Sequence, residues 1–204
     1  MIYMTRALFP FLFLASCSFI EVKDLPSLVK EITFGAPDII VDRKYYDAMP
    51  YSFIKVSYGK RYIGIYTLSD TDNGLYKWVG ADNSRLYTKN GKVLQSIGLI
   101  KNLKIINKWD YDFTLSYFKS DKLIMLENPT AMIEMSSTIK YIGDEEIFHI
   151  RNKISKYFEE DFQSTVISWG GKNKYWISEY GKVLRSVQSI HPHLEELEIT
   201  FFYK

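Results

Sequence analysis

From Tyr51 to Tyr203 the chain repeatedly alternates apolar and polar side chains, and Val, Ile, Tyr, Phe and Trp are frequent in the alternating runs. Successive side chains of a β-strand point to opposite faces, so a period of two is typical of strands with one buried face. Branched and aromatic residues also pack well on a pleated sheet. We therefore predict a mainly β, antiparallel protein. The predicted strands are residues 51–57, 62–68, 75–79, 85–89, 92–97, 113–118, 123–126, 131–142, 147–154, 162–169, 174–178, 183–190 and 197–203.

Local signals refine this prediction. Asn90-Gly91 separates two of the runs, and this dipeptide strongly favours a tight hairpin because both turn positions must accept a positive φ. The alternation in residues 197–201 indicates that one sheet face is in water, which we interpret as an open sheet or half-barrel. Residues 24–35 have apolar side chains at helical spacing, with Pro26 in the first turn and a terminal glycine. They predict one short N-terminal helix.

The chain contains an internal echo. The segment GKVLQSI at residues 91–97 recurs as GKVLRSV at residues 181–187. Two similar hairpin-containing halves would explain the echo. Coincidence between hairpins of similar composition remains an equal alternative, because two copies are too few to define a repeat architecture.

The N-terminus has the pattern of a secretory signal peptide. Arg6 is the one charge before an apolar run at residues 7–14, and small residues precede Cys17. The run is too short to span a bilayer. Its last residues, Leu14-Ala15-Ser16-Cys17, resemble the lipobox of bacterial lipoproteins, in which the signal is cut between the residues at positions 16 and 17 and the cysteine is acylated.

The rest of the chain supports a lipid on this cysteine. Cys17 is the single cysteine, and a free thiol is a liability in an oxidising compartment. The alternative is that residues 7–15 form a buried element and Cys17 is a core thiol. In lipoproteins that this segment resembles, the residue after the acylated cysteine influences sorting. Ser18, rather than Asp, at this position favours the outer over the inner membrane. We expect a signal peptide at residues 1–16, a lipid-anchored spacer at 17–22 and a single β-rich periplasmic domain at 23–204.

Composition and motifs exclude several function classes. The net charge of +2 without a basic block gives no reason to expect nucleic-acid binding. One cysteine cannot form an internal disulfide or a C-x-x-C pair. The sequence contains no phosphate loop, dinucleotide fingerprint, G-x-S-x-G or H-E-x-x-H. We therefore predict no metal, no cofactor and no enzymatic activity.

Four other features could carry chemistry. His191-Pro192-His193 could bind a metal, but we interpret it as a solvated loop. The acidic clusters at residues 144–146 and 159–161 could supply a glycosidase pair, yet adjacent acids point apart, and we interpret both as solvated turns. The basic segment 101–108 could contact lipid headgroups or form an exposed sheet edge. Trp78 and Trp176 are possible glycan-stacking aromatics, with core packing as the alternative.

Several stretches of the mature chain carry a family resemblance. Residues 50–56, 76–82 and 88–99, together with the closing segments 173–177 and 181–190, resemble the YjbF/GfcB family of bacterial outer-membrane lipoproteins. The resemblance implies a role in producing or exporting a capsule or related exopolysaccharide. It supplies no catalytic motif.

From these observations we expect an outer-membrane lipoprotein that faces the periplasm and is anchored in the bilayer through acylated Cys17. It would be a non-enzymatic component of polysaccharide export, with the polysaccharide or other export proteins as partners and no nucleic acid. One alternative is a carrier of lipid or lipidated cargo in a half-open β sheet. Another is a polysaccharide-cleaving enzyme.

Overall fold

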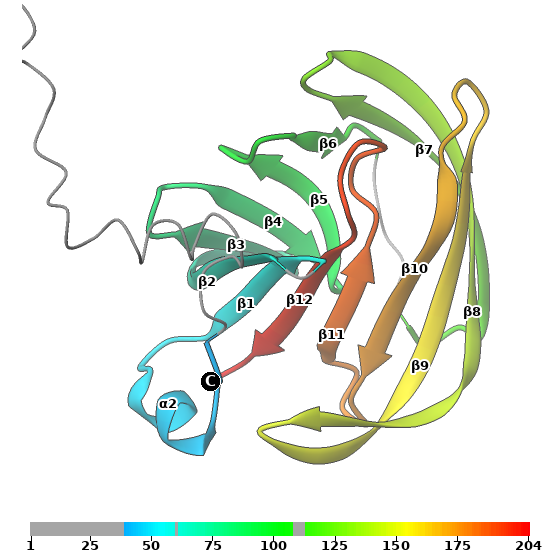
Figure 1. Cartoon of the computed structure of the whole chain (residues 1–204). Coiled ribbons are helices and arrows are strands. Elements are labelled where there is room, and N and C mark those ends of the chain that lie inside the picture. The colour runs from blue at the N-terminus through cyan, green and yellow to red at the C-terminus, as the bar shows by residue number, and fades with distance from the viewer. Residues whose placement is uncertain (1–38, 60, 108–112) are drawn as a thin grey trace, which may run out of the picture. The chain divides into compact units, whose positions relative to one another are not determined.

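The computed structural model describes residues 39–204, except residues 60 and 108–112. The predicted signal peptide, the lipobox with Ser16 and Cys17, and the predicted helix at residues 24–35 lie outside the described residues. Within that part of the chain, twelve antiparallel strands form one closed barrel (Figure 1). No helix there is both long and apolar enough to cross a membrane.

The strands follow one another around the barrel in chain order. They are β1 (Phe53–Tyr58), β2 (Arg61–Asp72), β3 (Leu75–Gly80), β4 (Arg85–Lys89), β5 (Lys92–Ile97), β6 (Leu103–Ile105), β7 (Tyr117–Leu126), β8 (Ala131–His149), β9 (Arg151–Ser164), β10 (Gly170–Ile177), β11 (Val183–Gln188) and β12 (Leu197–Phe202).

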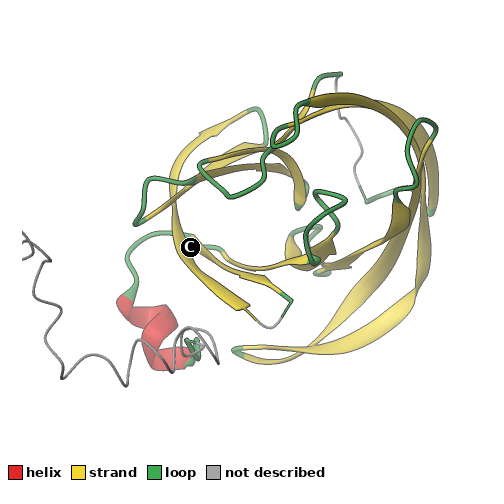
Figure 2. Ribbon diagram, turned by 45° about the horizontal axis from the view of Figure 1, so that its top comes forward, coloured by secondary structure: helices red, strands yellow, loops and turns green. Residues whose placement is uncertain are grey.

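The barrel corrects the prediction of an open sheet or half-barrel. The first and last strands pair, in a register that runs from Phe53 opposite Phe202 to Tyr58 opposite Leu197. Figure 2 shows the strands curled around one interior. A barrel wall with a filled interior and a wet exterior produces the same alternation as an open sheet with one wet face. The alternation therefore identifies the strands but does not reveal whether the first and last of them meet.

Apolar side chains fill the interior of the barrel. The largest fully buried ones include Trp78, Tyr66, Tyr175, Phe53 and Phe201. Register shifts interrupt several ladders, for example in the pairing of β8 with β9 and of β10 with β11. Such bulges bend and twist strands, which helps a long sheet to curl and close.

The prediction was wrong at the turn of the longest hairpin. Residues 147–154 were predicted as one strand, but β8 ends at His149 and β9 begins at Arg151. The turn residue, Ile150, has a φ of 63°. A branched residue rarely adopts this conformation, so the sequence offers no turn signal there. Ile150 packs against the cluster of Val41, Phe53 and Phe202, which holds the turn in place.

A short helix, α2 (Arg43–Ala48), precedes the first strand. Asp42 caps its N-terminus, where the side-chain carboxylate accepts a hydrogen bond from the Tyr45 backbone N–H at 2.7 Å. Tyr46 donates its hydroxyl to the backbone carbonyl of Tyr203 at 2.6 Å. The helix thus lies beside the C-terminus, together with the β8–β9 hairpin and the β10–β11 turn (Figure 1). We call this the α2 end of the barrel.

The two echoing hairpins, β4–β5 and β10–β11, meet across the interior. The side-chain amide of Gln188 donates to the carbonyl of Gly91 at 2.7 Å, and its oxygen accepts from the Val93 N–H at 3.0 Å. Gly91 also lies against the side chain of Val183. The echo therefore brings similar sequences into direct contact.

Candidate functional site

A buried ionic cluster lies inside the barrel around Glu160. Its side chain is fully buried and accepts hydrogen bonds from Lys92 at 2.7 Å, Asn173 at 2.8 Å and Tyr175 at 2.8 Å. Lys122 forms a second ion pair with the same carboxylate. The interpretation of residues 159–161 as a solvated turn is therefore wrong, because all three lie in β9 and the middle one points inward.

The electrostatics show that this cluster is a closed structural unit. Burial raises the pKa of the Glu160 carboxyl, but the positive charges of Lys122 and Lys92 outweigh burial and hold that pKa well below its ordinary value. The cavity beside the cluster measures about 20 Å³, which is room for about one water molecule. The carboxylate therefore has its partners within the fold and no space for a ligand.

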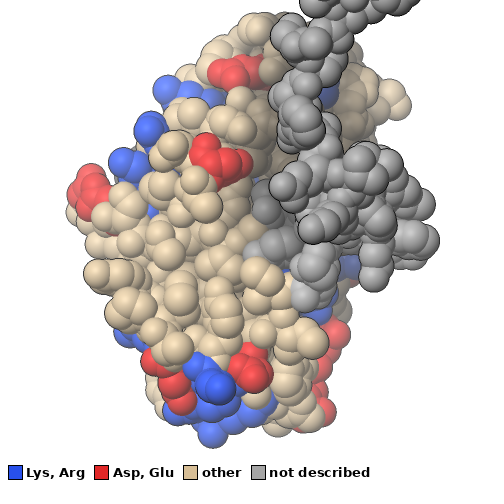
Figure 3. Space-filling model, turned by 60° about the vertical axis from the view of Figure 1, so that its left-hand side comes forward, with Lys and Arg blue, Asp and Glu red and all other residues tan. Residues whose placement is uncertain are grey.

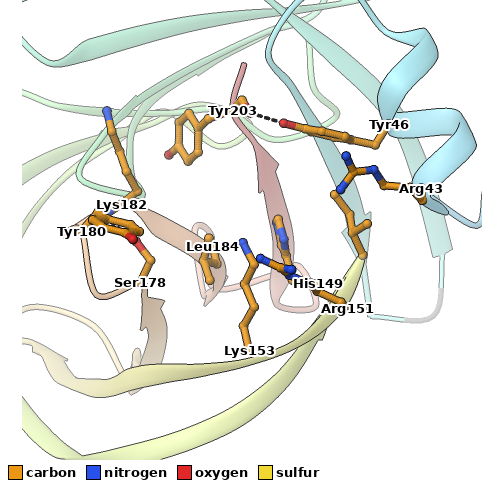
Figure 4. Close-up of a pocket in the computed structure, with 11 residues that line it drawn as sticks. Arg43, Tyr46, His149, Arg151, Lys153, Ser178, Tyr180, Lys182, Leu184 and Tyr203 are labelled. Carbon is orange, nitrogen blue, oxygen red and sulfur yellow. Dashed lines mark hydrogen bonds between the residues drawn. The ribbon is translucent and has the colours of Figure 1, made fainter.

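A larger pocket of about 250 Å³ opens at the α2 end (Figure 4). Its walls come from α2, the β8–β9 hairpin, the β10–β11 segment and the C-terminus. The lining residues are Arg43, Tyr46, His149, Ile150, Arg151, Lys153, Ser178, Tyr180, Lys182, Leu184 and Tyr203. The described residues of this lining include four cationic side chains and no carboxylate.

The basic side chains reach the pocket from three directions. Figure 4 shows Lys182 on one side, with Arg43 and Arg151 on the other and Lys153 below. Basic side chains also gather at the lower end of the face in Figure 3, which is the end that carries α2 in Figure 1. Asp47, outside the lining, pairs with Arg43 at 2.8 Å in an exposed i,i+4 contact. The pocket is thus electropositive.

His149 contributes a buried imidazole to this wall. The residue is 5% exposed, its ring stacks on Phe202 at a centroid distance of 4.8 Å, and Nε2 lies 2.7 Å from the carbonyl oxygen of Phe201. A carbonyl only accepts, so Nε2 carries the proton and Nδ1 of the neutral ring is an acceptor. Within the described residues Nδ1 has no hydrogen-bond partner.

Burial of His149 makes stability depend on pH. Burial, reinforced by the nearby charge of Lys153, lowers the pKa of His149 below its ordinary value of 6.5. As the pH falls through 6.5, His149 binds a proton more readily in the unfolded chain than in the folded one. The free energy of unfolding therefore decreases as the pH falls from about 7 towards 5.

We expect His149→Gln to flatten this decline by up to about 1.4 kcal/mol per pH unit, the value for one proton. Urea unfolding at a series of pH values measures it. Burial also lowers the pKa of His191, so part of the decline should remain in His149→Gln and disappear in the His149→Gln/His191→Gln double variant. Equal slopes for wild type and His149→Gln would contradict the assignment.

The tryptophans proposed for glycan stacking are both packed. Trp78 is 0% exposed and donates Nε1–H to Thr88 at 2.8 Å. Trp176 is 6% exposed, stacks on Tyr157 at 5.2 Å and lies under the Arg185 guanidinium at 4.9 Å. A sugar could stack on either ring only after these neighbours moved, and the pocket contains neither tryptophan.

The other candidates from the sequence are scattered over the barrel. His191, predicted in a solvated loop, is 1% exposed, whereas His193 is exposed. Residues 144–146 are exposed but lie in strand β8 and not in a turn. Within the basic segment 101–108, β6 pairs with both β5 and β7, so it is not a sheet edge. Among the described residues, no group of three His, Cys, Asp or Glu side chains could hold a metal.

Sequence reasoning missed the pocket because its residues come from four separate segments. Arg151 and Lys153 are basic residues in an alternating strand pattern, next to a turn that has no turn residues in the sequence. Lys182 belongs to the echoed motif. The one local signal is the basic hairpin tip that contains His149 and Arg151.

Comparisons with known proteins agree with this fold. A family model described as "Group 4 capsule polysaccharide lipoprotein gfcB, YjbF" matches residues 27–202. The uncharacterized lipoprotein GfcB of Escherichia coli (strain K12) is 26% identical over 202 residues, covering 93% of each chain. The crystal structure of the hypothetical lipoprotein YmcC from Escherichia coli (K12) has a TM-score of 0.69 at 23% identity, covering 92% of this chain and 98% of the other. The likeness to YmcC supports the fold, and the family model spans most of the sequence. The chain therefore belongs to the YjbF/GfcB family of capsule polysaccharide lipoproteins.

Proposed function

We propose that this protein is an outer-membrane lipoprotein that acts without enzymatic activity in the production or export of a capsule or related exopolysaccharide. Membership of a capsule polysaccharide lipoprotein family supports the polysaccharide role. The lipobox at residues 14–17 supports the anchor, with cleavage between Ser16 and Cys17 and acylation of Cys17. The remaining domain, from residue 23 onward, would face the periplasm.

The observation that carries this proposal is the basic pocket at the α2 end. It has room for part of a glycan, and four cations line it without a carboxylate. Hydrolysis of a glycosidic bond needs two carboxyl groups about 5–10 Å apart, and the lining supplies none. Glu160 is buried elsewhere, with its oxygens already bonded to lysines, an amide and a hydroxyl. This arrangement favours binding over cleavage.

The alternative of a lipid carrier loses its structural premise. That hypothesis required a half-open sheet with a continuous apolar concave face. The sheet is closed, its interior is filled by the core, and the cavity beside Glu160 measures only about 20 Å³. An acyl chain would need a far larger cavity inside the barrel.

The described part of the chain begins at the end of the barrel that bears the pocket. The first described residue, Ile39, packs with Phe53 and Phe202 at the α2 end. Cys17 precedes it by 39 − 17 = 22 residues, which span at most about 75 Å when fully extended. A membrane anchor at Cys17 would therefore tether the barrel by the end that bears the pocket.

A deletion strain tests the proposed function. We expect it to lose surface-attached polysaccharide while internal polymer is retained, because the defect is in export. The wild-type gene should restore the surface pool, and Cys17→Ala should not, since the unlipidated protein has no bilayer anchor. Gel analysis of surface and internal polysaccharide measures both pools.

Labelled palmitate provides the control for this experiment. Wild-type protein should carry the label and Cys17→Ala should not. Unchanged polysaccharide in both pools of the deletion strain would overturn the polysaccharide role, and label on Cys17→Ala would overturn the anchor.

A further inference from the structure

We propose that the pocket at the α2 end binds an acidic sugar residue, through its carboxylate and its ring hydroxyls together. This inference rests on the proposed function and names the chemical class of the ligand at the same site. Three independent features of the pocket support it: two cations that form no salt bridge within the described residues, a buried acceptor there without a donor, and an exposed aromatic side chain at the rim.

The cations are available to a ligand. Among the described residues, Arg151 and Lys153 form no salt bridge, and both project from the start of β9, close to the β8–β9 turn. Lys182, on the opposite wall, donates to the Tyr76 hydroxyl at 3.2 Å and lies 5.4 Å from the Tyr203 ring centroid. An anion entering between these walls would meet positive charge on both sides. Arginine in particular can bind a carboxylate through two parallel hydrogen bonds.

The wall also contains an acceptor that none of these cations satisfies. Nδ1 of His149 is buried and has no partner within the described residues, while Nε2 is committed to the carbonyl of Phe201. A buried acceptor without a donor is costly, and a ligand hydroxyl would supply the missing hydrogen. A simple carboxylate offers only acceptors at neutral pH, whereas a sugar acid offers both a carboxylate and hydroxyl donors.

An aromatic ring stands at the rim of the pocket. Tyr180 lines the pocket and is 84% exposed, so its ring is open to a ligand. The C–H face of a sugar ring is apolar and packs on such a surface. The pocket volume of about 250 Å³ lies below the roughly 300–1,000 Å³ of drug-sized sites, which suits one or two sugar rings of a longer chain.

The binding experiment compares two glycans that differ in charge. Full-length protein, purified in a nonionic detergent, is titrated calorimetrically with pentagalacturonate and with the neutral pentasaccharide maltopentaose. We expect pentagalacturonate to bind at least about tenfold more tightly, and its affinity to fall as salt is raised.

Two double variants locate the site. Arg151→Gln/Lys153→Gln should weaken pentagalacturonate binding by at least about tenfold, the scale of losing charged hydrogen bonds. Lys104→Gln/Lys119→Gln removes the same number of charges from exposed positions on β6 and β7 and should bind as wild type does. Circular dichroism should show both variants folded.

The Nδ1 resonance of His149 provides a separate measurement, because it reports on this side chain and not on the overall charge of the protein. In protein labelled with ¹⁵N-histidine, the Nδ1 resonance of His149 should shift when pentagalacturonate is added and should stay in place with maltopentaose. His149→Gln identifies the resonance by its loss.

Several outcomes would overturn the inference. These are equal affinity for the two glycans, wild-type affinity in Arg151→Gln/Lys153→Gln, or an unmoved His149 resonance at saturation. Phe148 and Ile154 are 73% and 74% exposed on the same hairpin, so phosphatidylglycerol vesicles are a necessary further arm. Vesicle binding that depends on Arg151 and Lys153, without glycan binding, would assign the pocket to lipid headgroups and overturn the sugar assignment.

The deletion strain separates this inference from the proposed function. The deletion strain could lose surface polysaccharide while the purified protein fails to bind pentagalacturonate. That result would contradict the ligand assignment alone. Specific binding combined with normal polysaccharide in the deletion strain would sink the proposed function and leave the pocket assignment intact.

Discussion

Glu160→Gln is expected to destabilise the barrel by about 3–5 kcal/mol, the range for removing one partner of a buried ion pair. The carboxylate serves Lys92, Lys122, Asn173 and Tyr175 at once. The neutral amide would leave both lysines without their counter-charge in the interior, and its NH₂ group would face donors. Total stabilities of about 5–15 kcal/mol make such a loss a large share of the whole.

Urea unfolding followed by circular dichroism measures this loss. Asp161→Asn is the matched control, because it makes the same chemical change one residue along β9, on the outer face. Its carboxylate is 47% exposed and lies 3.8 Å from Lys140, so we expect a cost below about 1 kcal/mol. A similar, small cost for both variants would show that the buried charge network contributes little.

Gly91→Ala is expected to be the second most damaging change, at about 2–5 kcal/mol. Gly91 has a φ of 72°, where a residue with a Cβ costs about 1–2 kcal/mol. A Cβ there would also lie 2.6 Å from Cγ1 of Val183, and such overpacking adds about 1–3 kcal/mol.

The echoed motif supplies the control for this prediction. Gly181 occupies the same place in the second copy, with a φ of 75° and nothing within 4 Å of its Cβ position. Gly181→Ala should therefore cost only the backbone strain. In a double-mutant cycle, Val183→Ala should reduce the cost of Gly91→Ala towards that of Gly181→Ala. Equal costs for the two glycine variants in wild-type background would refute the predicted contact across the interior.

The sequence predicted most strands because their signals are local. Asn90-Gly91 lies between β4 and β5, as expected from its turn chemistry. Alternation also predicted β12 correctly. The β8–β9 turn was missed because Ile150, held by packing against Phe53 and Phe202, replaces the usual turn residues. The helix at residues 43–48 was missed because it is a short, capped turn with little apolar periodicity.

Long-range features could not be predicted in this way. Closure depends on β1 meeting β12, and nothing near Phe53 or Phe202 in the sequence records that contact. Glu160 was misread because its neighbours are acidic, although strand alternation sends it to the opposite face from Glu159 and Asp161. The pocket depends on four segments that meet only after the barrel closes.

The pairing of the first strand with the last also governs when the fold can be completed. Phe53 cannot pair with Phe202 until β12 has been synthesised, because the two residues lie in the first and the last of the twelve described strands. Contacts between distant segments form slowly, since the loop between them must first be ordered. If the protein is exported as we propose, the barrel would close only after β12 has crossed the membrane.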